Sequence, residues 1–158
     1  MNFSDFVLDE AIITELKGTT KEEVVREMVQ SLVRANGVSS SDAPLVVDSI
    51  LRREELGSTG IGNGIAVPHT KNQSVENQVG VIAIGDKDGV DFDSIDGKKV
   101  NLFFMLVSPP DRPGEHLRAL EYITQRLRNA SFVDSLRHAA TLDEVKKILA
   151  EADGTDNK

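Results

Sequence analysis

The sequence predicts an α/β fold in which a mixed β-sheet, flanked by helices, forms a single domain. The chain has 158 residues, a length that suits one domain with one apolar core. Two short runs, residues 79–84 and 100–107, are mainly apolar and are bounded by turn-forming residues, as buried strands are. Helical periodicity occurs before and after these runs without strict alternation of strand and helix. This favours a mixed sheet over a doubly wound or all-β domain.

The first helix is predicted over residues 20–36. Its apolar side chains recur at helical spacing, Thr20 and Glu23 occupy capping-box positions, and Gly37 follows the end. Ahead of this helix, residues 11–13 form a short apolar run, Ala-Ile-Ile, that is a candidate strand.

A second helix is predicted from about Asp42 to Glu55, and its first turn tolerates Pro44. Its apolar side chains face inward, and Arg53 lies near its C-terminal end. Glu54 and Glu55 are most simply solvated charges of this helix, although either could orient the guanidinium of Arg53.

A helix is predicted over residues 115–128, after the second strand. A rigid, proline-rich connection over residues 108–114 leads into it. The side chains expected to face the interior are Leu117, Leu120, Ile123 and Leu127. Phe103, Phe104 and Met105 of the preceding strand are expected in the core.

Two shorter helices close the predicted fold. Ser131 is placed to cap the first of them, and Thr141 with Glu144 forms a capping box ahead of the second. No repeat, linker or low-complexity segment divides the chain. We therefore expect the domain to span residues 1–152 and residues 153–158 to form a frayed tail.

The composition excludes several classes of function. Eighteen basic against 26 acidic residues give a formal charge of −8, which would repel a phosphate backbone, so we expect no nucleic-acid partner. The chain contains no cysteine, which excludes thiolate chemistry and fits a reducing compartment, so we expect a cytoplasmic protein. Neither a signal peptide nor an apolar run of roughly 18 residues is found, so we expect no membrane insertion.

The most informative segment is a glycine-punctuated loop over residues 57–71, which leads through a short apolar run to His69. Pro68 fixes its own φ and pushes Val67 toward an extended conformation, so the imidazole of His69 can be aimed. Near neutral pH, an imidazole is largely in its uncharged, nucleophilic form. The glycines of the loop allow backbone N–H groups to approach an anion closely, which favours a phosphoryl group as the ligand.

The chain resembles the fructose/mannitol-type enzyme IIA domains of the bacterial phosphoenolpyruvate-dependent sugar phosphotransferase system. The resemblance is carried by residues 56–69, which read Leu-Gly-Ser-Thr-Gly-Ile-Gly-Asn-Gly-Ile-Ala-Val-Pro-His. Residues 18–23 and 91–97 also fit the family pattern, and His116 falls in the usual context before a leucine. The residues of this signature are most similar to those of the nitrogen-regulatory branch, a stand-alone enzyme IIA that reports phosphorylation state.

This resemblance implies an enzyme IIA fold and a phosphoryl carrier that needs no cofactor. His69 would accept a phosphoryl group on Nε2 from the phosphocarrier HPr or a paralogue. It would then pass the group to a IIB domain or hold it as a signal for a regulated target protein. Arg53 and His116 occupy the positions that the family uses to support the phosphoryl group, and an arginine fork suits two phosphoryl oxygens.

Two further residues are expected near this site. Thr70 departs from the small residue that usually follows the histidine, and its hydroxyl could donate to the phosphoryl oxygens or crowd the partner. Asn63 is most simply a turn residue, with a contact to the phosphoryl group as the alternative.

Other functions remain open from the sequence. The chain could be a regulatory binding module whose affinity for a partner is switched by phosphorylation of His69, without onward transfer. The glycine loop could bind a nucleotide, although a dinucleotide fingerprint follows a strand and opens a helix. A metal site built from His69, His116 and His138 is disfavoured by their spacing, so we expect no metal and leave His138 outside the site.

Overall fold

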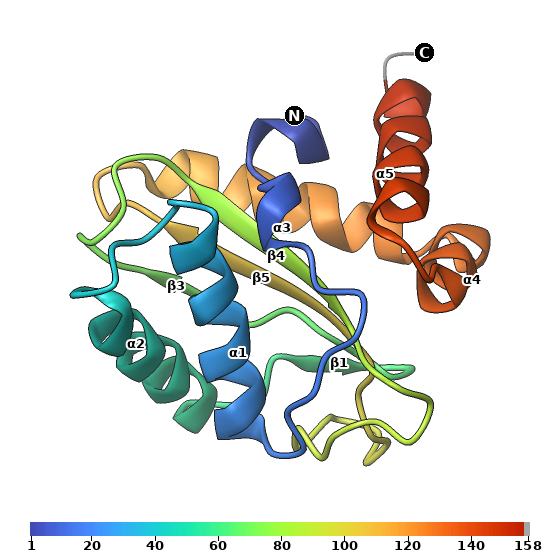
Figure 1. Ribbon diagram of the computed structural model, residues 1–158, viewed down its shortest axis with the longest axis horizontal. Helices are drawn as coiled ribbons and strands as arrows, with labels where there is room; N and C mark the ends of the chain where they lie inside the picture. Colours follow the sequence, from blue (N-terminus) through green and yellow to red (C-terminus); the bar gives the residue numbers. More distant parts are fainter. Residues whose placement is uncertain (157–158) are drawn as a thin grey trace.

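One mixed sheet forms the centre of the molecule (Figure 1). The computed structural model describes residues 1–156. The strands of the sheet are β1 (Gly60–Gly62), β2 (Ile65–Ala66), β3 (His69–Lys71), β4 (Val79–Ile84) and β5 (Leu102–Ser108). β5 lies in the middle, because β2 and β3 pair with it in parallel and β4 pairs with it in antiparallel orientation. The predicted mixed sheet is confirmed.

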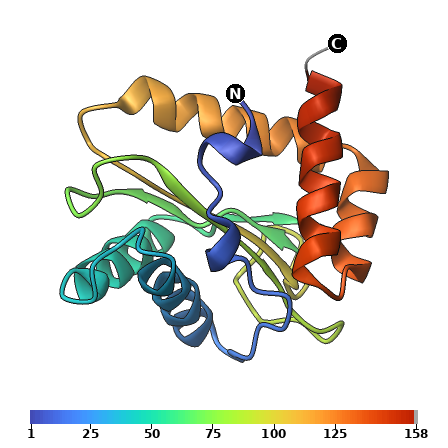
Figure 2. The same cartoon turned by 45° about the horizontal axis from the view of Figure 1, so that its top comes forward.

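Helices cover both faces of this sheet (Figure 2). They are α1 (Lys21–Arg34), α2 (Ala43–Glu55), α3 (Pro113–Leu127), α4 (Ala130–His138) and α5 (Leu142–Asp156), with two short 3-10 helices, η1 (Phe3–Asp5) and η2 (Asp9–Ala11). Helices α1 and α2 pack on one face, and α3, α4 and α5 lie on the other. The sheet therefore separates two apolar cores.

The alternation of side chains along β5 supplies both cores. Phe103, Met105 and Val107 belong to the core under α1 and α2. Leu102, Phe104 and Leu106 belong to the core under α3, α4 and α5. All of these side chains are buried, so the predicted core positions of Phe103, Phe104 and Met105 are confirmed.

The N-terminal region differs from the prediction. Residues 11–13 do not form a strand, because η2 ends at Ala11 and only Ile13 makes a single parallel bridge with Ala83. Thr20 caps α1 as predicted and accepts from the Glu23 backbone N–H. At the other end of α1, Asn36 rather than Gly37 takes the left-handed conformation, with φ of 61°.

The helices after the sheet depart from the sequence pattern in two details. Leu117 is 58% exposed, so its predicted burial is wrong, and the inward positions of α3 include His116 and Tyr122 instead. Asn129, not Ser131, caps α4, because its side chain accepts from the backbone N–H groups of Ser131 and Phe132.

Helix α5 continues to Asp156, beyond the expected start of the tail at residue 153. The buried carboxylate of Asp153 accepts from the backbone N–H groups of Phe3 and Ser4 and from the Tyr122 hydroxyl. These bonds hold the last turns of α5 against the N-terminus. The last two residues of the expected tail, 157–158, lie outside the described residues.

Candidate functional site

His69 opens β3 after a two-residue interruption of the strand. β2 and β3 keep the same register against β5, but Pro68 between them has no N–H to give to the ladder. The Nδ1–H of His69 donates to the carbonyl oxygen of Val67 over 2.8 Å. A carbonyl oxygen only accepts, so the proton lies on Nδ1 and the Nε2 lone pair is free. This carbonyl is the ring partner that a nucleophilic His69 requires.

The surroundings of His69 favour its neutral form. Burial lowers the pKa of the imidazole below its usual value, and the positive charges of Arg53 and Lys71 lower it further. The Val67 carbonyl and the carboxylate of Glu54 oppose this shift. His69 is partly exposed, so an incoming group can reach its ring.

His116 stands beside His69, although the two are 47 residues apart in the chain (116 − 69). Their ring centroids are 5.6 Å apart at an interplanar angle of 52°. His116 lies in the first turn of α3, is 7% exposed, and bonds through Nδ1 to the Ser108 hydroxyl at 2.6 Å. Burial, together with the neighbouring His69 and Lys71, lowers the pKa of His116 to about 4.

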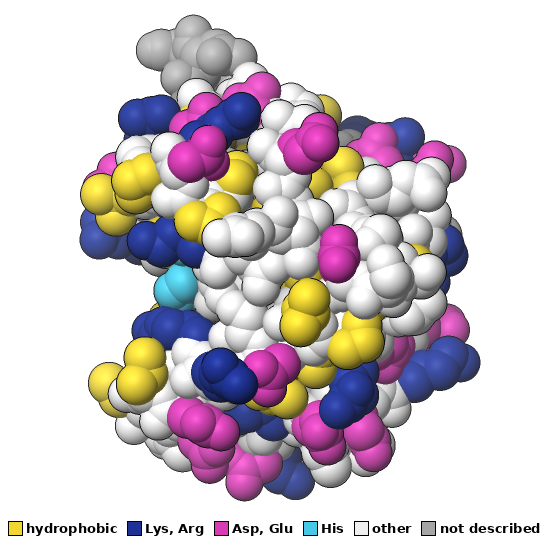
Figure 3. All heavy atoms as spheres, turned by 90° about the vertical axis from the view of Figure 1, so that its left-hand side faces the viewer, with side chains coloured by type: hydrophobic (Ala, Val, Ile, Leu, Met, Phe, Trp, Pro, Cys, Tyr) yellow, Lys and Arg dark blue, Asp and Glu magenta, His cyan; other side chains and the backbone are white. Residues whose placement is uncertain are grey.

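Arg53 lies at the end of α2, where its Nη1–H donates to the Gly57 carbonyl oxygen over 2.8 Å. Within the part of the chain that the structure describes, no hydrogen bond joins Arg53 to His69. The two are close enough, however, for the guanidinium to lower the pKa of the imidazole. Figure 3 shows a histidine in a hollow of this face, with lysine or arginine side chains on two sides and hydrophobic side chains beyond them.

Lys71 adds a second positive charge that the sequence analysis missed. It is two residues after His69 on the same strand, and side chains at this spacing share a face of the sheet. The two-residue spacing between His69 and Lys71 is the feature of the sequence that indicates this shared face. Lys71 lowers the pKa of both histidines, so the pair lies in a basic environment within a chain of net charge −8.

Glu54 is a buried carboxylate, not a solvated helix charge. It is 6% exposed, bonds Lys21 Nζ at 3.1 Å, and accepts from the backbone N–H and the hydroxyl of Thr59. Burial of an ionised carboxylate requires such partners. Glu54 therefore ties the end of α2 to the start of α1 and to the glycine-rich segment, and does not bond Arg53.

Thr70 faces away from the histidine pair. Neighbouring strand residues point to opposite faces, and Thr70 is 8% exposed on the side covered by α2. Its hydroxyl lies 2.5 Å from the Ser49 hydroxyl of α2. In this arrangement the Thr70 hydroxyl is occupied inside the molecule, so the structure supports neither direct donation to a phosphoryl group nor crowding of a partner.

The glycine-rich segment is a β-hairpin. β1 and β2 pair antiparallel through Asn63 and Gly64, whose φ values of 56° and 77° are those of a type I′ turn. The Asn63 N–H donates to Asp96 Oδ2, and its carbonyl oxygen accepts from Arg137. Neither partner belongs to the histidine pair. The hairpin leads into β3 and opens no helix, which contradicts the nucleotide-loop interpretation.

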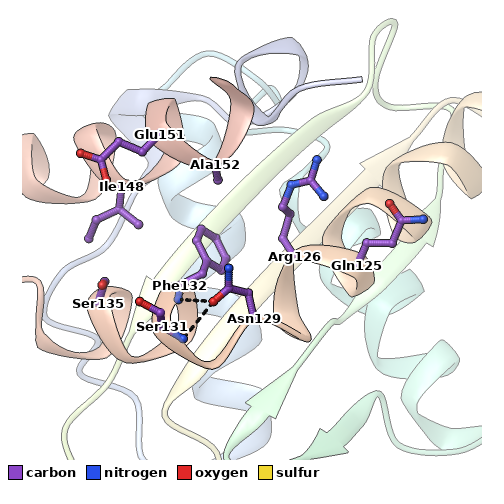
Figure 4. Close-up of a pocket in the computed structure, with 9 residues that line it drawn as sticks. All are labelled: Gln125, Arg126, Asn129, Ser131, Phe132, Ser135, Ile148, Glu151 and Ala152. Atoms are coloured by element: carbon purple, nitrogen blue, oxygen red, sulfur yellow. Dashed lines mark hydrogen bonds between the residues drawn. The ribbon is translucent and has the colours of Figure 1, made fainter. Parts of the chain in front are cut away.

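A cavity of about 280 Å³ lies between the end of α3, α4 and α5 (Figure 4). Two of the polar groups around it serve the fold, because Asn129 caps α4 and the Arg126 guanidinium stacks over the Tyr122 ring at 4.2 Å. None of the predicted site residues lines this cavity. We assign the candidate site to the histidine pair instead.

The third histidine lies apart from the other two. His138 Nδ1 bonds the Asp134 carbonyl oxygen of its own helix at 2.8 Å and is exposed. Among the described residues, no group of three or more histidine, aspartate or glutamate side chains is arranged to hold a metal ion.

Comparison with known proteins identifies the family. Residues 5–152 match the family described as phosphoenolpyruvate-dependent sugar phosphotransferase system, EIIA 2. The chain belongs to this family. A curated relative, the nitrogen regulatory protein of Bradyrhizobium diazoefficiens, is 33% identical over 150 residues, which span 95% of each chain. The resemblance inferred from residues 56–69 is confirmed.

Solved structures share the fold of this EIIA protein. The crystal structure of nitrogen regulatory protein IIA-Ntr from Neisseria meningitidis has a TM-score of 0.83 at 31% identity, over 93% of this chain and 98% of that one. The complex of enzyme IIAMTL and phosphorylated enzyme IIBMTL from Escherichia coli contains a chain with a TM-score of 0.75 at 28% identity, over 90% of this chain and 95% of that one. In the described part of the EIIA chain, no helix has the length and apolarity to cross a membrane.

Proposed function

We propose that this EIIA protein is a phosphoryl carrier that accepts a phosphoryl group on Nε2 of His69 from HPr or a paralogue. The observation that carries the proposal is the 2.8 Å bond from Nδ1–H to the Val67 carbonyl, which leaves Nε2 as the free nucleophile. The complex that a relative forms with phosphorylated IIBMTL supports a IIB domain as recipient. We also propose a cytoplasmic location, where HPr and phosphoenolpyruvate occur.

The proposed transfer exchanges one nitrogen–phosphorus bond for another. The Nε2 lone pair of His69 attacks phosphorus, while the bond to the donor's ring nitrogen breaks and its electron pair returns to that nitrogen. The Nδ1–H of His69 remains hydrogen-bonded to the Val67 carbonyl oxygen. This bond stabilises the positive charge that the ring gains. Arg53, Lys71 and a neutral His116 supply positive charge and an N–H donor for the oxygens of the transferred group.

The direct test incubates the protein with phosphoenolpyruvate, enzyme I and HPr and measures its intact mass. We expect an acid-labile phosphoryl adduct on the natural protein and on the His138→Ala control, but not on His69→Ala. Absence of the adduct with cognate components would contradict the carrier function. An adduct that persists in His69→Ala would move the site elsewhere while preserving the carrier function.

The supporting residues have their own controls. Arg53→Gln and His116→Asn should each slow transfer by about tenfold or more, since the first removes a positive charge and the second is too short to place an N–H where Nε2 of His116 lies. The matched control is Arg52→Gln, whose exposed side chain pairs with Asp48 on the same helix. If a variant of Arg53 or His116 lowers the melting temperature as well as the transfer rate, that residue has a structural role.

A regulatory role is a second candidate. It is favoured by the match to a nitrogen regulatory protein over 95% of that relative's length. In this case phosphorylation of His69 would change the affinity for a target protein without onward transfer. Phosphorylated protein that cannot lose its group to any IIB domain, but changes affinity for a target, would establish this role.

A further inference from the structure

A line of three polar side chains leads from β4 to the histidine pair. Gln78, just before β4, donates from Nε2 to the Ser108 Oγ at the end of β5 over 2.8 Å. The same Oγ lies 2.6 Å from Nδ1 of His116. Ser108 has no exposed surface, so water cannot replace either bond. Neither Gln78 nor Ser108 stands out in the sequence, because only the sheet and the turn into α3 bring them to His116.

The direction of the hydrogen bonds follows from the atoms available. A serine hydroxyl has one hydrogen to donate and two lone pairs to accept with. The Gln78 N–H occupies one lone pair of Ser108 Oγ, and within the described residues His116 Nδ1 is the other partner of that oxygen. If Nδ1 also donated, the Ser108 hydrogen would be buried without an acceptor, which is costly. Ser108 therefore donates to Nδ1, and the neutral ring of His116 carries its proton on Nε2.

The fold places Ser108 on the same face of the sheet as His69. Ser108 lies opposite Lys71 of β3, and Leu106, two residues earlier in β5, lies opposite His69. Residues at this spacing share a face, which is the face that α3 covers. His116 enters from the first turn of α3 directly after the connection that follows Ser108. Its Nδ1 thus meets Ser108, while its ring lies beside that of His69.

We propose that Gln78 and Ser108 are positioning residues that fix His116 in the Nε2–H tautomer, so that this N–H is offered to the phosphoryl group carried by His69. The use of the N–H rests on the proposed carrier function, whereas the tautomer itself does not. The same tautomer gives the free protein a neutral N–H donor on the ring that lies beside His69. The line of hydrogen bonds from Gln78 through Ser108 to His116, called the relay below, requires no cofactor or ion.

The decisive variant is Gln78→Glu, which keeps the shape of the side chain but replaces its N–H donor with an acceptor. The Ser108 hydroxyl would then donate to the carboxylate, and its oxygen would accept from Nδ1–H of His116. The relay would run in reverse and leave Nε2 of His116 without a proton. Gln78→Leu is the matched control, because it removes the donor without adding an acceptor and leaves Ser108 free to donate to Nδ1.

The tautomer is read from the imidazole ¹⁵N shifts and long-range ¹H–¹⁵N couplings at about pH 8, where a histidine of low pKa is neutral. We expect Nε2–H in the natural protein and in Gln78→Leu, and Nδ1–H in Gln78→Glu. Nδ1–H in the natural protein, or Nε2–H retained in Gln78→Glu, would overturn the proposed relay. Neither measurement depends on phosphoryl transfer.

Transfer rates then test whether the Nε2–H tautomer of His116 assists phosphoryl transfer to His69. Gln78→Glu should accept the phosphoryl group about tenfold more slowly than Gln78→Leu at equal melting temperature, because a donor to a charged group is lost. A reversed tautomer with an unchanged rate would overturn the role of this N–H in transfer. Failure of the natural protein to accept phosphate at all would instead contradict the carrier function and leave the tautomer assignment standing.

Discussion

Two imidazoles at 5.6 Å set the chemistry of the candidate site at the scale of single residues. Each has a lowered pKa, because burial and neighbouring positive charge disfavour the imidazolium. Both rings are therefore neutral near pH 7, which suits the proposed roles of His69 as nucleophile and His116 as donor. A dianionic phosphoryl group on His69 would raise the pKa of His116 toward its usual value.

The lowered pKa of His116 predicts a loss of stability in acid. The unfolded chain takes up a proton near pH 6.5, whereas the folded chain does so only near 4. Between these values the unfolded state binds more protons, so the free energy of unfolding falls as the pH falls. We expect His116→Gln to lose about 2 to 3 kcal/mol less than the natural protein between about pH 7 and pH 4.

This difference can be measured by urea unfolding at several pH values. His138→Gln is the control, since it replaces an exposed histidine that lies apart from the histidine pair. Parallel pH profiles for the natural protein and His116→Gln would mean that His116 titrates normally in the folded state.

At the scale of secondary-structure elements, a hydroxyl pair couples α2 to β3. Ser49 and Arg53 are four residues apart and share a face of α2, while Thr70 directly follows His69. The 2.5 Å contact between Ser49 Oγ and Thr70 Oγ1 therefore joins the helix that carries the guanidinium to the strand that carries the nucleophile. The Thr70 hydroxyl thus has a hydrogen-bonding partner on α2.

We predict that Ser49→Ala and Thr70→Val each lower the free energy of unfolding by about 1 kcal/mol and slow transfer severalfold. Each single variant removes one hydroxyl and leaves the other without this partner, and the remaining hydroxyl is buried in Thr70 but only half-buried in Ser49. The double variant should lose little more than one single variant, with a coupling of about 1 kcal/mol in a double-mutant cycle. Thr70→Ser keeps the hydroxyl and is the control. Additive losses would show that the two hydroxyls act independently.

At the scale of the whole molecule, Asp153 joins the two ends of the chain. Its carboxylate accepts hydrogen bonds from the backbone N–H groups of Phe3 and Ser4 and from the Tyr122 hydroxyl. Helices α5, η1 and α3 therefore meet at one buried carboxylate. Burial and the bond to Asp153 raise the pKa of the Tyr122 hydroxyl, which keeps it a donor at all ordinary pH values.

We predict that Asp153→Ala lowers the free energy of unfolding by about 2 to 3 kcal/mol, because three donors lose their acceptor. Phosphoryl acceptance by His69 should be unchanged under conditions where the variant is folded. Urea unfolding and the mass assay measure the two effects, with Glu121→Ala on the exposed face of α3 as control. A loss no larger than that of the control would place Asp153 outside the stable fold.

The sequence predicted most elements but not their partners. Residues 79–84 form β4 as predicted, since a buried strand needs only local apolar character and turn residues at its ends. The second strand starts at Leu102 instead of residue 100, because Val100 pairs with Val90 in a separate bridge. Leu117 was assigned to the core because it has helical spacing, yet it is exposed beside the buried His116. Periodicity locates a helix more reliably than it orients one.

By itself, the sequence determined the α/β class, the family and the candidate nucleophile, because these depend on local pattern and on the residues around Pro68 and His69. Tertiary structure alone decided which groups surround that nucleophile. Glu54, Ser108 and Gln78 are ordinary polar residues in the sequence, and each acquires its role only when the sheet and its helices bring a partner within hydrogen-bonding distance. Burial then gives those bonds their importance, since a buried polar group without a partner costs about 1 to 3 kcal/mol of a small net stability.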